Sequence, residues 1–354
     1  MLYTARAMAS KSASSEVLRA PFPDFLRIIL CFGVCFYHFT PERPACGSYM
    51  VLGFLVLSGF LLGVHFERIS ALDALRFYSS KIKRLLPLFV VALAIGVGVR
   101  WALCIVNPGT SGMLPAYSSE GWGNFNPAIF VAYYNAPLWY MVIEFFMLLC
   151  APFLFWAYKG RWALYVVLAL SVLTAWFLYS QVPYSSDHGS GLYYSPIARL
   201  WQFVAGLCAA KLMSRCSGGE HPIRHRVANA ACVLFAGLFL AGAWWTMSVK
   251  QAAELHFWNY TFDFDCLVVL LYAVLVPLLY SRTWKMGGKP SSVLAWLALL
   301  TYPVYLLHVP FYIAITGVWK RIFTDVDFIC VGLVVAVTMA VGALLLQLQK
   351  KLID

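Results

Sequence analysis

Residues 328–348 of this 354-residue chain read FICVGLVVAVTMAVGALLLQL and contain no charged side chain. A helix needs roughly 20 mainly apolar residues to cross the hydrocarbon core of a bilayer, and this stretch has that length. A helix satisfies all of its own backbone polar groups within lipid, and an uninterrupted apolar run of this length is typical of one. The stretch therefore predicts a membrane-spanning helix.

Similar apolar runs recur along the chain, with Pro- and Gly-containing segments between them, as at Asn107-Pro108-Gly109. We count ten runs and predict an all-α fold, a polytopic transmembrane helical bundle of about ten transmembrane helices. The ninth run contains Pro303 and Pro310, so we expect a kink in it. The runs are 25–43, 49–66, 86–106, 137–157, 162–180, 194–213, 228–248, 264–281, 292–318 and 328–348.

The composition agrees with a membrane protein, because 62% of the residues are hydrophobic and only 12% are charged. An ordinary soluble domain is about half apolar and about a quarter charged. The charged residues of this chain are too few to cover the surface of a soluble protein of this size. The composition therefore argues against a soluble enzyme, a disordered chain and a nucleic-acid-binding protein. We expect one integral membrane domain over residues 1–354, with residues 1–24 as a short cytoplasmic arm and no additional soluble domain.

The net charge of +11 indicates the orientation of the helices. When the N-terminus is placed in the cytoplasm, 19 of the 26 Lys and Arg residues fall in cytoplasmic segments, as the positive-inside rule requires. Ten spans then place both termini in the cytoplasm. Most of the basic excess therefore sets topology, and only a small part is left for an anionic ligand.

Two ionisable residues share one face of the first run. Arg27 and His38 are eleven residues apart, which is about three helical turns and roughly 16 Å. In the expected orientation Arg27 lies near the cytoplasmic end and His38 near the outer end. Lys81, Lys83 and Arg84 precede the third run and add cations at the inner level. We expect Arg27 and these cations to bind a polyanionic cytoplasmic ligand, although the cluster at 81–84 also fits a pure topology anchor.

A second set of ionisable side chains is expected nearer the outer surface. Glu144 lies one to two turns into the fourth run, Arg199 opens the sixth, and His308 lies in the outer half of the ninth. Together with His38 they predict acid–base chemistry, because a histidine suits proton removal from a hydroxyl. Two structural alternatives stay open: a Glu144–Arg199 ion pair, and His308 as an interhelical hydrogen-bonding residue. We expect no metal site, although Cys31, Cys35 and His38 have helical ligand spacing.

Six motifs in order resemble the acyltransferase-3 family of integral membrane acyltransferases. Arg27 and His38 match its Arg-x10-His signature, and 53–60 is similar to its second-helix motif. The motifs continue at 77–87, at 138–144 with Trp139, at 198–206, and at 301–310 with Tyr302 and His308. They extend from Asp24 to Pro310. Departures from the family pattern are Thr301 for Ser, Gln202 for an acidic residue and Lys81 for Arg.

The resemblance implies transfer of an acyl group, commonly acetyl, from cytoplasmic acyl-CoA to an acceptor hydroxyl. His38 would act as general base or as transient acyl carrier, and we group Glu144 with it as catalytic. Arg27, Lys81 and Arg84 would bind the phosphates of the donor. Trp139, Arg199, Tyr302 and His308 would shape or support the site. Acyl-CoA would be a co-substrate, and no bound cofactor is expected.

We therefore predict an O-acetyltransferase that modifies a cell-surface or exported glycan from a bacterial cytoplasmic membrane. One alternative is another acyl group, such as succinyl, or a small-molecule or lipid-linked acceptor. The alternative from a different class is a proton-coupled transporter with His38 and Glu144 as its relay. The sequence indicates neither the acceptor nor the oligomeric state. We expect residues 107–136 and 181–195 to line the acceptor entrance.

Overall fold

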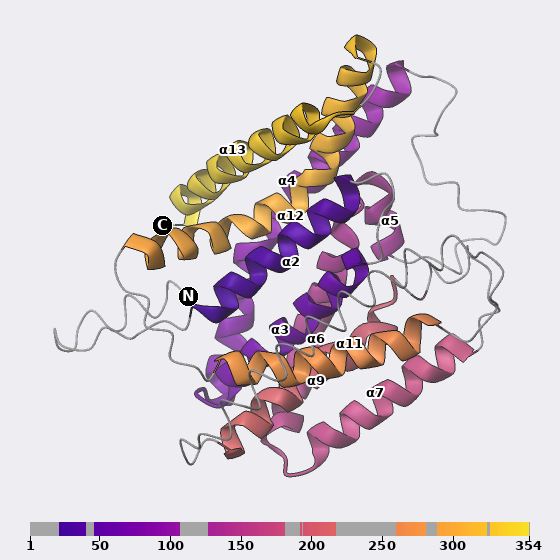
Figure 1. The fold of residues 1–354 in the computed structure, drawn as a ribbon. Coiled ribbons are helices and arrows are strands. Elements are labelled where there is room, and N and C mark those ends of the chain that lie inside the picture. The colour runs from indigo at the N-terminus through magenta and orange to yellow at the C-terminus, as the bar shows by residue number, and fades with distance from the viewer. Residues whose placement is uncertain are drawn as a thin grey trace.

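The computed structural model describes residues 21–39, 46–106, 127–180, 192, 194–216, 260–280, 289–323 and 326–353. These residues form ten helices and no strand, which confirms the all-helical prediction (Figure 1). The helices are α2 (Phe22–Phe39), α3 (Cys46–Phe66), α4 (Ala71–Val106), α5 (Pro127–Tyr134), α6 (Leu138–Lys159), α7 (Ala163–Ser180), α9 (Pro196–Cys216), α11 (Tyr260–Tyr280), α12 (Lys289–Ile322) and α13 (Phe328–Ile353).

Seven of the described helices are long and apolar enough to cross a membrane: α2, α3, α4, α6, α7, α12 and α13. Two more, α9 and α11, coincide with the predicted runs 194–213 and 264–281. The remaining run, 228–248, lies outside the described residues, as do most of the arm 1–24 and of the two segments expected to line the entrance. The described part of the chain is a helical membrane bundle.

Local capping sets several helix ends. Ser70 and Asp73 cap the start of α4: the Asp73 backbone N–H lies 3.4 Å from Ser70 Oγ, which also donates to the Asp73 carboxylate at 2.7 Å. The helix therefore begins at Ala71, 15 residues before the apolar run at 86. Asp327 caps α13 in the same way, since its Oδ1 accepts from the Cys330 backbone N–H at 2.8 Å. Lys81 consequently lies inside α4 and not at its entrance.

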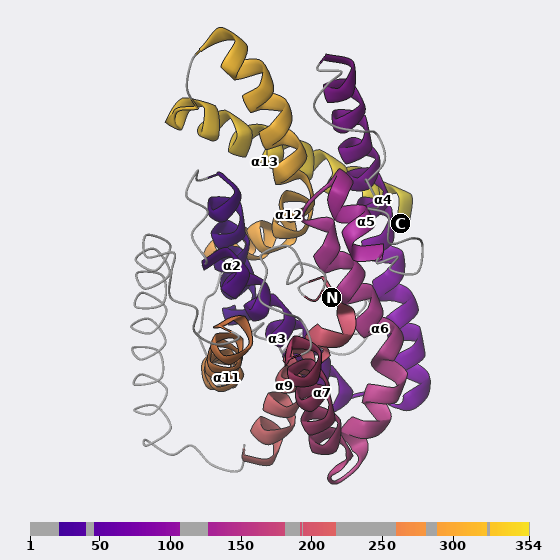
Figure 2. The same ribbon diagram turned by 90° about the vertical axis from the view of Figure 1, so that its right-hand side faces the viewer.

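The centre of the bundle is the crossing of α3 and α9 (Figure 2). Glycines allow their backbones to touch: a Cβ on Gly59 would lie 2.0 Å from the Phe203 carbonyl oxygen, and one on Gly206 would lie 2.1 Å from that of Val56. Small residues permit such close packing of membrane helices. Both glycines belong to motifs quoted above, so this crossing gives those motifs a packing reason.

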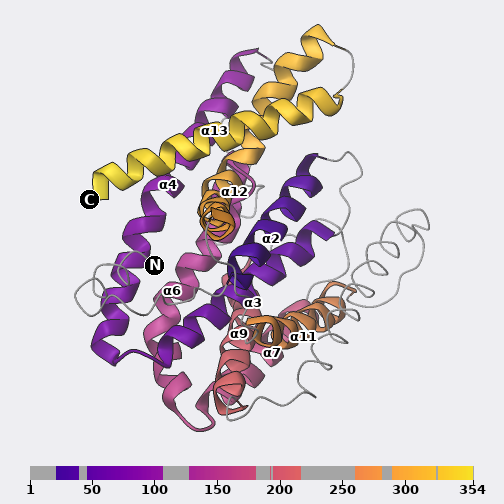
Figure 3. The same cartoon turned by 60° about the vertical axis from the view of Figure 1, so that its left-hand side comes forward.

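Helices α2, α6, α7 and α11 surround this crossing, while α12 packs on α2, α4 and α13. Figure 3 shows that α12 changes direction along its length, as the internal residues Pro303 and Pro310 predict. Large apolar side chains on the outer faces, such as Leu170, Trp176 and Ile329, are exposed in the isolated chain. Lipid covers such faces in a membrane, whereas the buried polar side chains described below, such as Glu144 and His308, lie between the helices.

Candidate functional site

Two histidines from the ends of the chain meet between α2 and α12. The ring centroids of His38 and His308 are 5.1 Å apart. Phe39 lies beside them, 6.0 Å from the His308 ring, and stacks on Tyr312 at 5.2 Å. The sequence placed these two histidines at a similar depth, and the structure brings their rings together. His308 is completely buried, whereas His38 is partly accessible.

Backbone contacts determine which nitrogen of His308 carries the proton. Its Nδ1 lies 2.8 Å from the carbonyl oxygen of Tyr305 and 3.3 Å from that of Val304. A carbonyl oxygen can only accept, so Nδ1 carries the hydrogen and, in the neutral ring, Nε2 carries the lone pair. Nε2 is buried and has no hydrogen-bond partner among the described residues. In the described part of the chain, His308 therefore presents a proton acceptor that no other protein group occupies.

A row of tyrosines connects the histidines with Glu144. The Tyr305 ring lies 5.9 Å from that of His308 and 5.6 Å from that of Tyr140. The Tyr140 hydroxyl donates to Glu144 Oε2 at 3.3 Å. Phe54 packs against both tyrosine rings, at 5.9 Å and 5.8 Å. The row is therefore continuous from α12 to α6.

The row ends at an ion pair between Lys81 and Glu144, whose Nζ and Oε1 are 3.2 Å apart. The side chains are only 17% and 6% exposed, so each charge compensates the other within the bundle. The sequence placed Lys81 at the inner level and Glu144 in an outer set, and this separation is wrong. The physical reason is the early start of α4, which carries Lys81 into the interior beside α6.

Arg84 lies one turn further along α4, where two hydrogen bonds hold the backbone. The Tyr302 hydroxyl donates to the Leu85 carbonyl oxygen at 2.7 Å, and Gln349 Nε2 donates to the Arg84 carbonyl oxygen. Helices α12 and α13 are thereby tied to α4 beside Arg84, which is an exposed residue in the isolated chain. Tyr302, which the sequence analysis expects to shape or support the site, thus contacts the backbone next to Arg84.

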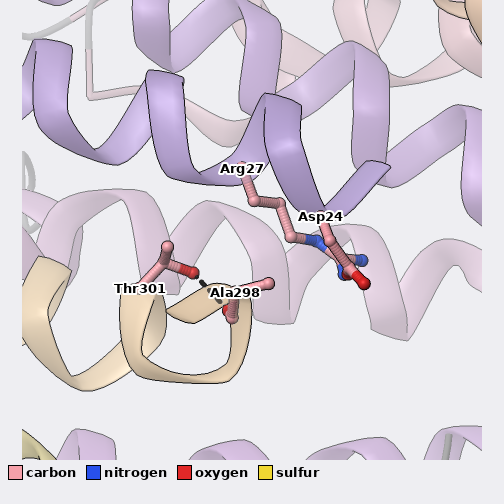
Figure 4. Close-up of polar contacts among 4 residues, drawn as sticks. All are labelled: Asp24, Arg27, Ala298 and Thr301. Carbon is pink, nitrogen blue, oxygen red and sulfur yellow. Dashed lines mark hydrogen bonds and ion pairs between the residues drawn. The ribbon is translucent and has the colours of Figure 1, made fainter. Parts of the chain in front are cut away.

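Arg27 has a carboxylate partner that the sequence interpretation did not assign. Its Nη1 lies 3.3 Å from Oδ1 of Asp24, three residues earlier on α2. Figure 4 shows the two side chains with their charged ends together, beside the turn of α12 that contains Ala298 and Thr301. The spacing of three was the available signal, since residues i and i+3 share a helix face.

Arg199 and Trp139 lie in neighbouring parts of the bundle. Arg199 Nη1 is 2.8 Å from Asp265 Oδ2, which joins α9 to α11 in a pair whose side chains are 3% and 10% exposed. Since Glu144 binds Lys81, the alternative of a Glu144–Arg199 pair is wrong. Trp139 is buried, with its ring 5.4 Å from that of Tyr194. Asp265 lies inside a predicted run and was not assigned a role.

A comparison with known protein families now bears on this arrangement. The sequence profile of acyltransferase family 3, described as an acyltransferase domain, matches residues 21–347, which is nearly the whole chain. The chain belongs to the acyltransferase-3 family. It is accordingly a multi-pass membrane acyltransferase. No curated protein and no solved structure matches the chain.

The positions quoted for the acyltransferase-3 resemblance share one region of the fold. His38, Lys81, Glu144 and His308 come from α2, α4, α6 and α12 and lie along the row described above, while Tyr302 on α12 contacts the Leu85 backbone on α4. Tyr140 and Tyr305 belong to the quoted motifs, yet only the structure shows that they connect the histidines with the ion pair. Cys31 is one of the two cysteines that have helical ligand spacing with His38. Its Sγ donates to the Thr301 carbonyl oxygen at 3.5 Å.

Proposed function

We propose that this acyltransferase transfers an acetyl group from cytoplasmic acetyl-CoA to a hydroxyl of a cell-surface or exported glycan, at a bacterial cytoplasmic membrane. The observation that carries the proposal is the His38–His308 pair, whose rings are 5.1 Å apart and which is connected to Lys81 through Tyr305, Tyr140 and Glu144. An acyl transfer from a thioester needs a base for the hydroxyl and cations for the phosphates of the donor. One row of residues contains both kinds of group.

The proposed step begins with the acceptor hydroxyl near His38. The imidazole takes the hydroxyl proton while the oxygen attacks the thioester carbonyl carbon, which gives a tetrahedral intermediate. The C–S bond then breaks, the electron pair leaves with the CoA sulfur, and the imidazolium returns the proton to that sulfur. The products are the O-acetyl ester and CoA. In this scheme His308 Nε2 stabilises the proton on His38.

The three proposed donor-binding residues have unequal surroundings. Arg27 is paired with Asp24 and Lys81 with Glu144, so a phosphate must compete with a carboxylate at both positions. Arg84 is exposed, with its backbone held by Tyr302 and Gln349 nearby. We therefore assign the largest share of donor affinity to Arg84, since a guanidinium binds phosphate oxygens in a bidentate manner.

Substitution of Arg84 tests the donor assignment. We expect Arg84→Ala to raise the KM for acetyl-CoA roughly tenfold or more and to leave the KM for the acceptor within about twofold, because a charge-assisted hydrogen bond contributes about 1.5–3 kcal/mol. Isothermal titration of CoA into protein in nanodiscs measures the same loss directly. Arg76→Ala is the matched control, because Arg76 is an exposed cation on the same helix that pairs with Asp73 and is given no role in donor binding. Equal CoA affinity of Arg84→Ala and wild type would overturn the assignment.

The acceptor is tested in cells. Mass spectrometry of surface and exported glycans, with and without the gene, should show 42 Da acetyl increments that disappear on deletion and return with the wild-type gene. Each increment is about the mass that one acyl group adds to a hydroxyl. A loss of about 100 Da increments would therefore indicate succinyl transfer. Unchanged glycans, with a changed lipid-linked or small metabolite, would replace the glycan by the alternative acceptor.

A further inference from the structure

Pro310 leaves one backbone acceptor of α12 without its usual partner. In a helix the carbonyl of residue i accepts from the N–H of residue i+4, and proline has no N–H. The carbonyl oxygen of Leu306 is the one that Pro310 would have served. Leu306 is 1% exposed, so neither water nor lipid headgroups reach this position. An unsatisfied carbonyl here would be costly, since the membrane interior offers no other donor.

Asn135 supplies the missing donor from another part of the chain. Its Nδ2 lies 2.9 Å from the Leu306 carbonyl oxygen and 3.2 Å from the Ala92 carbonyl oxygen. The side chain is 1% exposed, and it lies in the short connection between α5 and α6. One amide group therefore joins α12 and α4 to the start of α6.

The surroundings fix the position of Asn135. Its backbone N–H donates to the Val131 carbonyl oxygen and its own carbonyl accepts from the Leu138 N–H, both at 3.0 Å. On α4, Gly96 makes the close approach possible, because a Cβ there would lie 2.6 Å from the Tyr134 carbonyl oxygen and 2.8 Å from Asn135 Cβ. The amide is thus held from both sides before it reaches α12.

The carbonyl that Asn135 binds lies within the turn of α12 that carries Tyr305 and His308. Leu306 is flanked by Tyr305, which accepts from His308 Nδ1 through its carbonyl and contacts Tyr140 through its ring. His308 is two residues beyond Leu306 and faces His38. The three helices that Asn135 joins carry Lys81, Glu144 and His308. A shift of this turn would therefore move the His308 Nε2 lone pair relative to His38.

We propose that Asn135 is a positioning residue: it satisfies the carbonyl that Pro310 frees and so holds the α12 turn that sets His308 against His38. Asn135 acts through Leu306 and does not touch the reacting atoms in this assignment. Its effect on acetyl transfer rests on the proposed function, whereas its bond to the carbonyl freed by Pro310 does not. The two parts are tested separately.

The test is a double-mutant cycle on the purified full chain in nanodiscs, with Asn135→Ala, Pro310→Ala and the combined variant. Pro310→Ala restores an N–H for the Leu306 carbonyl, so the combined variant should regain most of what Asn135→Ala loses. The matched control is Asn135→Ala with Pro303→Ala, because Pro303 frees the Leu299 carbonyl, which lies about two turns before Leu306. This control should show no rescue.

Three readouts are compared. We expect Asn135→Ala to lower the apparent Tm by roughly 3 °C or more, since a buried acceptor loses its donor. Diethyl pyrocarbonate should modify His308, which is fully buried in wild type, several-fold faster in Asn135→Ala, as counted by peptide mass spectrometry. The kcat for CoA release from acetyl-CoA should fall roughly 10–100-fold with little change in the KM for acetyl-CoA, because small misplacements of reacting groups have effects of this size.

Rescue of all three readouts by Pro310→Ala, and not by Pro303→Ala, supports the proposal. The proposal is overturned when Asn135→Ala and its combination with Pro310→Ala show equal losses. If Asn135→Ala alone does not fold, a combined variant that also does not fold overturns it in the same way. Asn135→Ala can also lower only the Tm, with His308 modification and kcat as in wild type. If Pro310→Ala then restores the Tm, the role of Asn135 is purely structural and the positioning assignment is overturned. If wild type releases no CoA, the proposed donor is wrong, while the Tm and His308 readouts still decide the role of Asn135.

Discussion

His38→Ala is expected to lower the rate of acetyl transfer roughly 10²–10⁴-fold, because a general base contributes a factor of this size. The substitution removes the partly accessible imidazole of the pair and leaves His308, which is buried and whose Nδ1 is bound to backbone carbonyls. The kcat for CoA release, with protein amount and monodispersity checked by size exclusion, measures the effect.

His65→Ala is the matched control for this substitution. His65 also lies on a membrane-spanning helix, where its ring packs 4.0 Å from that of Phe77, and it has no role in the proposed step. Its rate should equal that of wild type within about twofold. Acid-quenched wild-type protein separates the two possible roles of His38: an acetyl label on its imidazole indicates a carrier, and its absence a base. A His38→Ala enzyme with normal kcat would contradict both.

The second large effect is expected on stability, at the Arg199–Asp265 pair. Arg199→Leu should lower the free energy of unfolding by about 3–5 kcal/mol, because it leaves the Asp265 carboxylate buried without its counter-charge. The double variant Arg199→Leu/Asp265→Leu should recover most of this loss, since no charge is then stranded. Apparent Tm and the monodisperse fraction in detergent measure both. Activity of the recovered double variant would show that Arg199 supports the site only through packing of α9 on α11.

An exposed ion pair provides the control for this experiment. Arg76 and Asp73 lie 3.9 Å apart with side chains 86% and 55% exposed. Arg76→Leu should change the free energy of unfolding by less than about 1 kcal/mol, as is usual for surface pairs. The account of the buried pair is contradicted when Arg199→Leu is no less stable than Arg76→Leu, or when the double variant is no more stable than the single one.

Apolar length predicted most of the helices, because the thickness of a bilayer fixes a minimum span. The start of α4 was the main error: the apolar run began at 86, whereas the helix begins at Ala71. The signal was present in the Ser70 and Asp73 cap, which hydropathy does not detect. Since Lys81 lies in the missed segment, its depth and its pairing with Glu144 were missed together.

Periodicity along one helix predicted part of the site. Arg27 and His38 share a face of α2, and the pairing of His38 with His308 followed the expected similarity in depth. Contacts between helices depend on their relative rotation, which periodicity within each helix does not determine. Asp265 and Asn135 are therefore missing from the predicted site, although Asp265 lies within a predicted run and Asn135 lies two residues before another.

The central claim is that the His38 site moves an acetyl group from acetyl-CoA to a hydroxyl. Purified protein in nanodiscs is given [14C-acetyl]acetyl-CoA together with a glycan extract from cells that lack the gene. The account predicts release of CoA with equimolar transfer of label to base-labile esters of the glycan, and loss of both in His38→Ala. Acetyl-CoA that stays intact with folded, monodisperse wild-type protein, or equal label transfer by His38→Ala, would contradict it.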